Sequence, residues 1–172
     1  MKKLKIGYFA DGPWAHQALQ KILSDKTLQV SFICGRNDDP DQFLEAKAIE
    51  NCLNFITHPN INSDEFHARM IEFQCDLFVS MSFNQIFRNK LINLPPLKTI
   101  NCHAGKLPFY RGRNILNWVL INDEQEFGIT VHYVDEGIDT GDIIIQRCYP
   151  ITDNDNYATI LDYAYEACAE IG

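Results

Sequence analysis

Three polar residues stand at the ends of apolar runs and carry side chains suited to acyl transfer. Asn101 and His103 flank Cys102, and side chains alternate along a strand, so Asn101 and His103 point the same way. An amide N–H and an imidazole on one side can stabilise a developing oxyanion. Asp139 adds a carboxylate that fixes the tautomer of His103 and raises its pKa. The set predicts a site where an amine attacks an acyl carbon and His103 takes its proton.

Two other interpretations of these residues are open. A nucleophilic Cys102–His103 pair would need both side chains on one side of the strand, which extended geometry denies, so we expect Cys102 to be buried. Alternatively, His103 is a structural histidine with its hydrogen bonds satisfied, and Asp139 is a turn residue before Thr140-Gly141. The flanking sequences decide between these interpretations and catalysis.

Apolar runs along the chain alternate between strand and helix spacing. Strands are expected at Leu4–Ala10, Gln29–Cys34, Asn54–Thr57, Asp76–Ser82, Lys98–Cys102, Phe127–Val134 and Asp142–Pro150. Helices are expected at Trp14–Ser24, Asp41–Cys52, 63–73 with Ser63 as the cap, Phe83–Leu91, Asn114–Ile121 and Tyr157–Ala169. This order predicts an α/β fold, a Rossmann-like, doubly wound, mostly parallel sheet with flanking helices. Ligands of such sheets bind beyond the carboxyl ends of the strands, where Asn101, His103 and Asp139 fall.

Length, charge and cysteine content limit the function classes. The 172 residues fit a single domain. A net charge of −8 argues against nucleic acid as a partner. The apolar runs are far shorter than the roughly 20 residues that span a bilayer, and the N-terminus does not resemble a signal peptide, so we expect no membrane partner and a cytoplasmic protein. The six cysteines lack a Cys-x-x-Cys pair, which predicts reduced thiols and no metal.

Four short motifs together resemble one family. They are Asn-x-His at 101–103, Leu-Pro-x-Tyr-Arg-Gly at 107–112, Gly-Ile-Thr-Val-His at 128–132 and Asp-Thr-Gly-Asp at 139–142. Their order and spacing are similar to those of the 10-formyltetrahydrofolate-dependent formyltransferases, most strongly over 76–150. The resemblance implies a formyltransferase catalytic domain over residues 1–172 and 10-formyltetrahydrofolate as the co-substrate.

The resemblance also assigns roles to individual residues. Asn101, His103 and Asp139 match the catalytic residues of the family. Folate is expected to contact residues of two segments and one arginine, namely Gln85, Ile86, Phe87, Asp135, Glu136, Gly137, Ile138, Asp139 and Arg113. For Gln85–Phe87 the alternative is a helix N-terminus that packs on the core.

Departures from the family motifs favour one branch. The segment Ala10–Trp14 replaces the Gly-Ser-Asn phosphate loop of the glycinamide ribonucleotide enzymes. The tRNA enzymes read Ser-Leu-Leu-Pro-x-Trp-Arg-Gly and carry a further domain with a basic surface. Here Tyr110–Arg113, followed by Asn117–Leu120, is similar to the aminoarabinose formyltransferase. The prediction is N-formylation of a UDP- or dTDP-4-amino-4-deoxysugar that feeds cell-surface polysaccharide, and Lys106 is either a diphosphate contact or a solvated loop residue.

Three alternative functions stay open at this point. One is formylation of methionyl-tRNA, and another is hydrolysis of formyl-folate with water in place of the amine. The third is a catalytically silent folate- or nucleotide-binding module, since a fold does not fix a function. Sugar-modifying members of the family usually carry residues beyond the catalytic domain, which leaves open both a truncated chain and a homodimer.

Overall fold

The computed structural model describes residues 2–103, 105, 107–111 and 115–152. Its strands are β1 (Leu4–Ala10), β2 (Leu28–Cys34), β3 (Asn54–Ile56), β4 (Leu77–Met81), β5 (Thr99–His103), β6 (Glu126–Tyr133) and β7 (Ile143–Pro150). Its helices are α1 (Gly12–Ser24), α2 (Gln42–Glu50), α3 (Asp64–Phe73), α4 (Asn89–Ile92) and α5 (Ile115–Ile121). Each strand coincides with a predicted one to within a few residues. The helix predicted at Tyr157–Ala169 lies outside the described residues.

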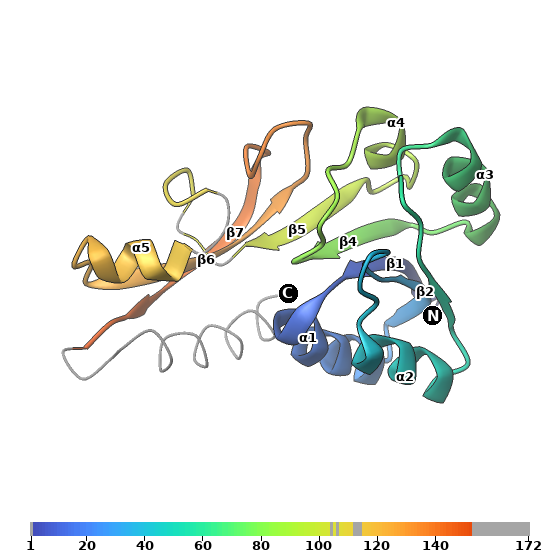
Figure 1. Ribbon diagram of the computed structural model, residues 1–172, viewed down its shortest axis with the longest axis horizontal. Helices are drawn as coiled ribbons and strands as arrows, with labels where there is room; N and C mark the ends of the chain where they lie inside the picture. The colour runs from blue at the N-terminus through green and yellow to red at the C-terminus, as the bar shows by residue number, and fades with distance from the viewer. Residues whose placement is uncertain (1, 104, 106, 112–114, 153–172) are drawn as a thin grey trace.

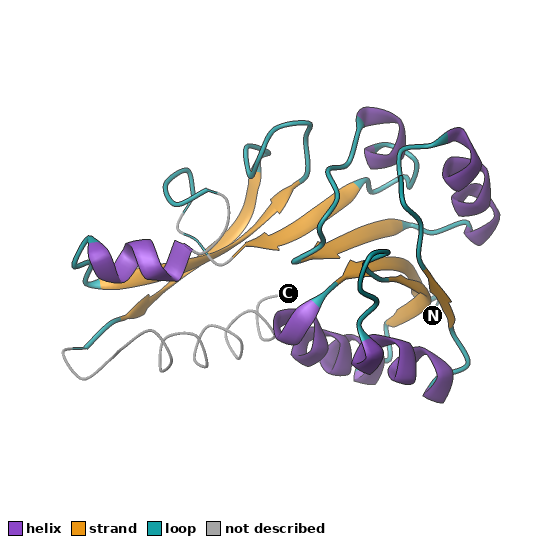
Figure 2. Ribbon diagram, viewed as in Figure 1, coloured by secondary structure: helices purple, strands orange, loops and turns teal. Residues whose placement is uncertain are grey.

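One seven-stranded sheet of order β3-β2-β1-β4-β5-β6-β7 forms the centre of the molecule. The strands from β3 to β5 are parallel to their neighbours, whereas β6 and β7 are antiparallel. Helices α1 and α2 lie below the sheet and α3 and α4 above it (Figures 1 and 2). The predicted doubly wound, mostly parallel α/β architecture is therefore confirmed. Its strand order reverses between β1 and β4, and only β4 separates this switch from β5, which carries His103.

Separate apolar cores hold helices to the two faces of the sheet. Along β1 the side chains alternate, so Tyr8 enters the core that α1, α2 and α5 complete, while Phe9 enters the core under α3 and α4. Phe9 also contacts Phe32 and Phe78 edge to face, with ring centroids 5.5 and 5.1 Å apart. Because both faces are covered, the parallel strands read as continuous apolar runs in the sequence. The sheet that carries the site is therefore held in place by an apolar core on each of its faces.

Carboxylate and hydroxyl caps start two of the helices. The Oδ1 atom of Asp41 accepts from the backbone N–H groups of Phe43 and Leu44 at the start of α2. Its Oδ2 atom lies 2.6 Å from Nε2 of His16 and accepts from the N–H of Gly12 at 2.9 Å. Asp41 thereby joins the N-terminal ends of α1 and α2. Ser63 caps α3 as predicted, since its Oγ accepts from the third residue of the helix.

The helix predicted at Phe83–Leu91 is wrong for most of its length, because only Asn89–Ile92 is helical. The preceding backbone is held in another conformation by a side chain from the β3–α3 loop. Nδ2 of Asn62 donates to the carbonyl of Ile86 at 2.7 Å, and its Oδ1 accepts from the N–H of Arg88 at 2.8 Å. These bonds hold the loop after β4 against the loop after β3 in a non-helical conformation.

Candidate active site

Strand pairing places the predicted catalytic residues on one side of the sheet. Asn101 lies opposite His132, and His103 lies opposite Thr130, in the antiparallel pair of β5 and β6. Cys102 is buried on the other side, within the core that α5 covers. The alternation predicted for β5 is therefore confirmed, and the Cys102–His103 nucleophilic pair is excluded by geometry.

Asp139 lies between two imidazoles. Its Oδ2 atom is 3.4 Å from Nδ1 of His103, and its Oδ1 atom is 3.3 Å from Nε2 of His132. The residue belongs to the loop between β6 and β7 and has a φ of 53°, a left-handed conformation that Asp tolerates better than most residues. Its side chain is only 14% exposed. The fold therefore brings the predicted amide, imidazole and carboxylate together.

His132 belongs to the same cluster; the sequence placed it in the Gly-Ile-Thr-Val-His motif at 128–132 but gave it no role. It is 3% exposed, and its Nε2 atom lies 3.2 Å from Nδ2 of Asn101. The signal for it was present in the sequence. It stands two residues after Thr130 in the strand predicted at Phe127–Val134, so both side chains share one face. His132 lies inside its strand and not at a strand end, where reactive residues were expected.

Burial lowers the pKa of His103 below its ordinary value of 6.5. The carboxylate of Asp139 and the carbonyl of Tyr110 oppose this shift, and the neighbouring His132 adds to it. The predicted upward effect of the Asp139 carboxylate on this pKa is therefore present, but loss of water outweighs it and the net shift is downward. A lowered pKa keeps His103 neutral near pH 7, the form in which it can accept a proton.

The other ring nitrogen of His103 is covered by the loop that follows β5. Its Nε2 atom lies 2.6 Å from the carbonyl oxygen of Tyr110. Gly105 lies against the same nitrogen, where a Cβ would stand 2.5 Å away. The hydroxyl of Thr130 donates to the carbonyl of Gly105 at 2.7 Å, and Gln146 donates to that hydroxyl at 2.8 Å. Residues of β6 and β7 thus hold this loop onto the imidazole.

The predicted folate segment after β4 has two structural side chains and one exposed one. Gln85 accepts from the N–H of Ile61 at 3.0 Å and donates to the carbonyl of His58 at 2.8 Å. Phe87 is 4% exposed and packs in the core under α3 and α4. The side chain of Phe87 therefore packs in the core, and the side chain of Gln85 anchors a neighbouring loop. Ile86 is 51% exposed and free to contact a ligand.

The second predicted folate segment lies beside the first. The Oε1 atom of Glu136 accepts from the N–H of Asn89 at 3.2 Å, which joins the β6–β7 loop to the start of α4. Asp135 shapes the turn, because its Oδ1 accepts from the N–H of Gly137 at 2.9 Å. Ile138 is 61% exposed. The two segments therefore meet, as a shared ligand would require.

The remaining predictions concern two basic residues, metal binding and membrane spans. Arg113 and Lys106, predicted near the cofactor and a diphosphate, lie outside the described residues. Within the described ranges, no group of three or more His, Cys, Asp or Glu side chains is arranged to hold a metal ion. In the same ranges, every helix falls short of the length and hydropathy that crossing a bilayer requires.

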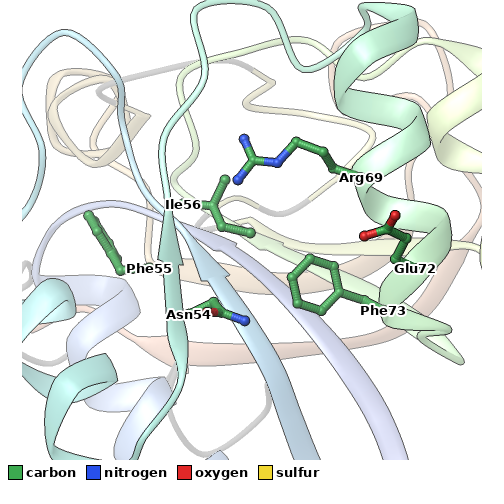
Figure 3. A pocket seen from close by; sticks show the side chains of 6 residues that line it. All are labelled: Asn54, Phe55, Ile56, Arg69, Glu72 and Phe73. Atoms are coloured by element: carbon green, nitrogen blue, oxygen red, sulfur yellow. The ribbon is translucent and has the colours of Figure 1, made fainter.

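A separate cavity of about 240 Å³ lies at the far edge of the sheet (Figure 3). It opens between β3 and α3 and is lined by Asn54, Phe55, Ile56, Arg69, Glu72 and Phe73. Four strand spacings of about 4.8 Å, or roughly 19 Å, separate β3 from β5. The cavity shares no residue with the Asn101–His103–Asp139 cluster, which we take as the reactive centre because its groups converge.

A doubly wound sheet with an amide, an imidazole and a carboxylate at its carboxyl edge defines an α/β protein built for group transfer. Comparison with known proteins makes this specific. The chain belongs to the formyl transferase family, which it matches over residues 5–169.

Curated relatives are longer than this chain. A methionyl-tRNA formyltransferase of Syntrophus aciditrophicus is 39% identical over 104 residues, which make up 60% of this chain and 33% of that protein. A second, from Clostridioides difficile, is 31% identical over 159 residues, or 88% of this chain and 51% of that protein. The chain therefore spans between a third and about half the length of these relatives.

Solved structures share the fold. The phosphoribosylglycinamide formyltransferase of Bacillus halodurans superposes with a TM-score of 0.84 at 21% identity, over 97% of this chain and 90% of that one. WlaRD, described as a sugar 3N-formyl transferase in the presence of dTDP and 5-N-formyl-THF, gives a TM-score of 0.74 at 27% identity. That comparison covers 99% of this chain and 61% of WlaRD.

Proposed function

We propose that the protein transfers a formyl group from 10-formyltetrahydrofolate to the amine of a nucleotide-linked amino sugar, with Asn101, His103 and Asp139 as catalytic residues. The observation that carries the proposal is the position of Asp139, 3.4 Å from Nδ1 of His103, with Asn101 on the same face of the sheet. A carboxylate, an imidazole and an amide in this order are the groups that amine acylation needs.

The reaction follows from the chemistry of these groups. The amine attacks the formyl carbon, and the carbonyl oxygen becomes an oxyanion that the Asn101 amide stabilises. Neutral His103 accepts the amine proton, and Asp139 stabilises the imidazolium that forms. The bond from the formyl carbon to N10 then breaks, and His103 returns the proton to N10. The carbonyl of Tyr110 faces Nε2 and only accepts, so Nε2 carries the ring proton in this structure. The amine takes the place of that carbonyl once the ring proton lies on Nδ1, towards Asp139, which frees Nε2 to accept.

The surface beside the cluster fits a flat, partly apolar co-substrate. Ile86 and Ile138 are more than half exposed and belong to two loops that the Asn89–Glu136 bond holds together. Apolar side chains with backbone groups between them are the usual lining of small-molecule sites. The further contacts with Gln85, Phe87, Gly137 and Arg113 are part of the same proposal.

Charge and sequence favour a nucleotide amino sugar as acceptor. A net charge of −8 opposes the long-range attraction that a tRNA acceptor needs, whereas one small diphosphate needs only a few local cations. The segment Tyr110–Arg113 supplies such cations and resembles the aminoarabinose branch. Of the relatives described above, WlaRD acts on a sugar, according to its description.

Methionyl-tRNA is the second candidate acceptor. The observation in its favour is the identity of 39% and 31% to two methionyl-tRNA formyltransferases. This chain spans at most about half the length of either protein.

One panel of acceptors separates the candidates. Purified protein is incubated with 10-formyltetrahydrofolate and UDP- or dTDP-4-amino-4-deoxysugars, methionyl-tRNA, glycinamide ribonucleotide or buffer alone. We expect an amino-sugar product heavier by one CO unit in mass spectrometry. Formylation of methionyl-tRNA alone would favour the second candidate, and release of formate in buffer alone would favour hydrolysis. If formyl-folate is consumed with none of these acceptors, the proposal that the protein is an enzyme is wrong.

A further inference from the structure

We propose that His132 is a positioning residue that sets the direction of the Asn101 amide. The proposal rests on the function proposed above, in which the N–H of Asn101 meets the oxyanion. It concerns a residue that is buried between β5 and β7 and touches both Asn101 and Asp139. Three contacts of the imidazole carry the argument.

The first contact fixes the tautomer of His132. Its Nδ1 atom lies 2.8 Å from the carbonyl oxygen of Tyr133. A carbonyl oxygen only accepts, so Nδ1 carries the proton in the neutral ring. Nε2 is then the unprotonated nitrogen and acts as an acceptor.

The second contact fixes the amide. Nε2 of His132 lies 3.2 Å from Nδ2 of Asn101, and an acceptor there is satisfied by the amide nitrogen and not by the amide oxygen. A half-turn of the amide would place two acceptors face to face. One N–H of Asn101 is therefore given to His132, and the second N–H of the same nitrogen is left for the reacting carbonyl. Without His132 the amide could turn its oxygen to the oxyanion and repel it.

The third contact places a carboxylate beside the ring. Oδ1 of Asp139 lies 3.3 Å from Nε2 of His132, while Oδ2 of the same carboxylate faces His103. Because Oδ1 and Nε2 both accept in this tautomer, the N–H of Asn101 is the donor that satisfies Nε2. The four side chains form one connected group in which Asp139 touches both rings. His132 thus links the residue that moves the proton with the residue that holds the oxyanion, and touches no reacting atom itself.

Two substitutions separate positioning from a structural role. In H132Q the amide oxygen can occupy the place of Nε2 and accept from Asn101. In H132N the shorter side chain reaches only the place of Nδ1, so it keeps a donor for Tyr133 but loses the acceptor for Asn101. Both variants are polar and of similar volume, and a thermal melt checks that each is folded before it is assayed. H132N should lower kcat by about tenfold or more with KM nearly unchanged, and H132Q should restore most of it.

The decisive test is a double-mutant cycle with N101A, with 10-formyltetrahydrofolate and UDP-4-amino-4-deoxyarabinose as substrates. If His132 acts through Asn101, H132N has an effect of less than about twofold in the N101A background. An equal effect in both backgrounds, or H132Q as impaired as H132N, would overturn the proposal. Full activity of N101A alone would instead overturn the catalytic assignment. If the wild-type chain turns over no UDP sugar, the same cycle is run on the acceptor that the panel identifies.

Discussion

Replacement of Asn101 by Ala should remove one oxyanion donor and little else. The side chain is half-buried and uses one amide N–H on His132, which leaves a single N–H for the reacting oxygen. Loss of one such donor costs about 2.7–4 kcal/mol of transition-state stabilisation, or about 10²–10³ in kcat. The loss to the fold should be limited to the one hydrogen bond that the buried Nε2 of His132 accepts, about 1–3 kcal/mol, and a thermal melt measures it.

The assay is single-turnover formyl transfer, which isolates the chemical step from binding and release. Cys102→Ala is the matched control, because Cys102 is adjacent in sequence and buried on the opposite face of β5. We expect N101A to lose two to three orders of magnitude and C102A to transfer formyl at a rate within about threefold of wild type. An N101A protein that is folded and fully active would refute the reasoning, and a dead, folded C102A would return the nucleophilic pair to consideration.

Three other perturbations test the account at different points. Because burial lowers the pKa of His103, kcat/KM of the wild type should stay constant below pH 6.5 and fall only as the pH drops through that lowered pKa. Asp139→Asn removes the charge that stabilises the imidazolium, so the acid limb of its pH profile should move to still lower pH. A move of that limb to higher pH would contradict this. Asp41→Ala loses the α2 cap and the contact with His16, which should lower the unfolding free energy by about 2–4 kcal/mol in urea denaturation, whereas a loss below about 0.5 kcal/mol would show that the contact contributes nothing. Gly105→Ala would place a methyl group 2.5 Å from Nε2 of His103, and the imidazole or the loop must move to make room. Such a displacement of a catalytic group should lower kcat by about 100-fold in steady-state assays. A kcat near that of wild type would show that the loop is not held against the imidazole.

Local patterns in the sequence were sufficient for the fold. Buried strands covered on both faces read as continuous apolar runs, and the α1 pattern placed Ala15, Ala18, Leu19 and Ile22 on one face. The segment before α4 was missed for a tertiary reason. The groups that hold it, including the side chain of Asn62, come from a loop more than twenty residues earlier, and no local spacing reports such a bond.

The direction of the side chains on β5 was predictable from strand geometry, whereas the properties of the site that depend on burial were not. Alternation along β5 was enough to pair Asn101 with His103 and to remove Cys102. The net pKa shift of His103 depends on how completely other elements exclude water, which a sequence does not show. His132 was missed because it stands inside β6, whose partner strand only the fold reveals. The anchoring of a neighbouring loop by the Gln85 amide is likewise a tertiary contact that no local pattern reports.

The destination of the formyl carbon tests the central claim most directly. The protein is given 10-formyltetrahydrofolate labelled with carbon-13 in the formyl group, together with a UDP- or dTDP-4-amino-4-deoxysugar, and the label is followed by NMR. The account predicts that the label appears in a formamide on the sugar with wild-type protein, and about 10²–10³ more slowly with N101A. Label that appears as formate, or that stays on folate while the sugar amine is unchanged, would contradict it.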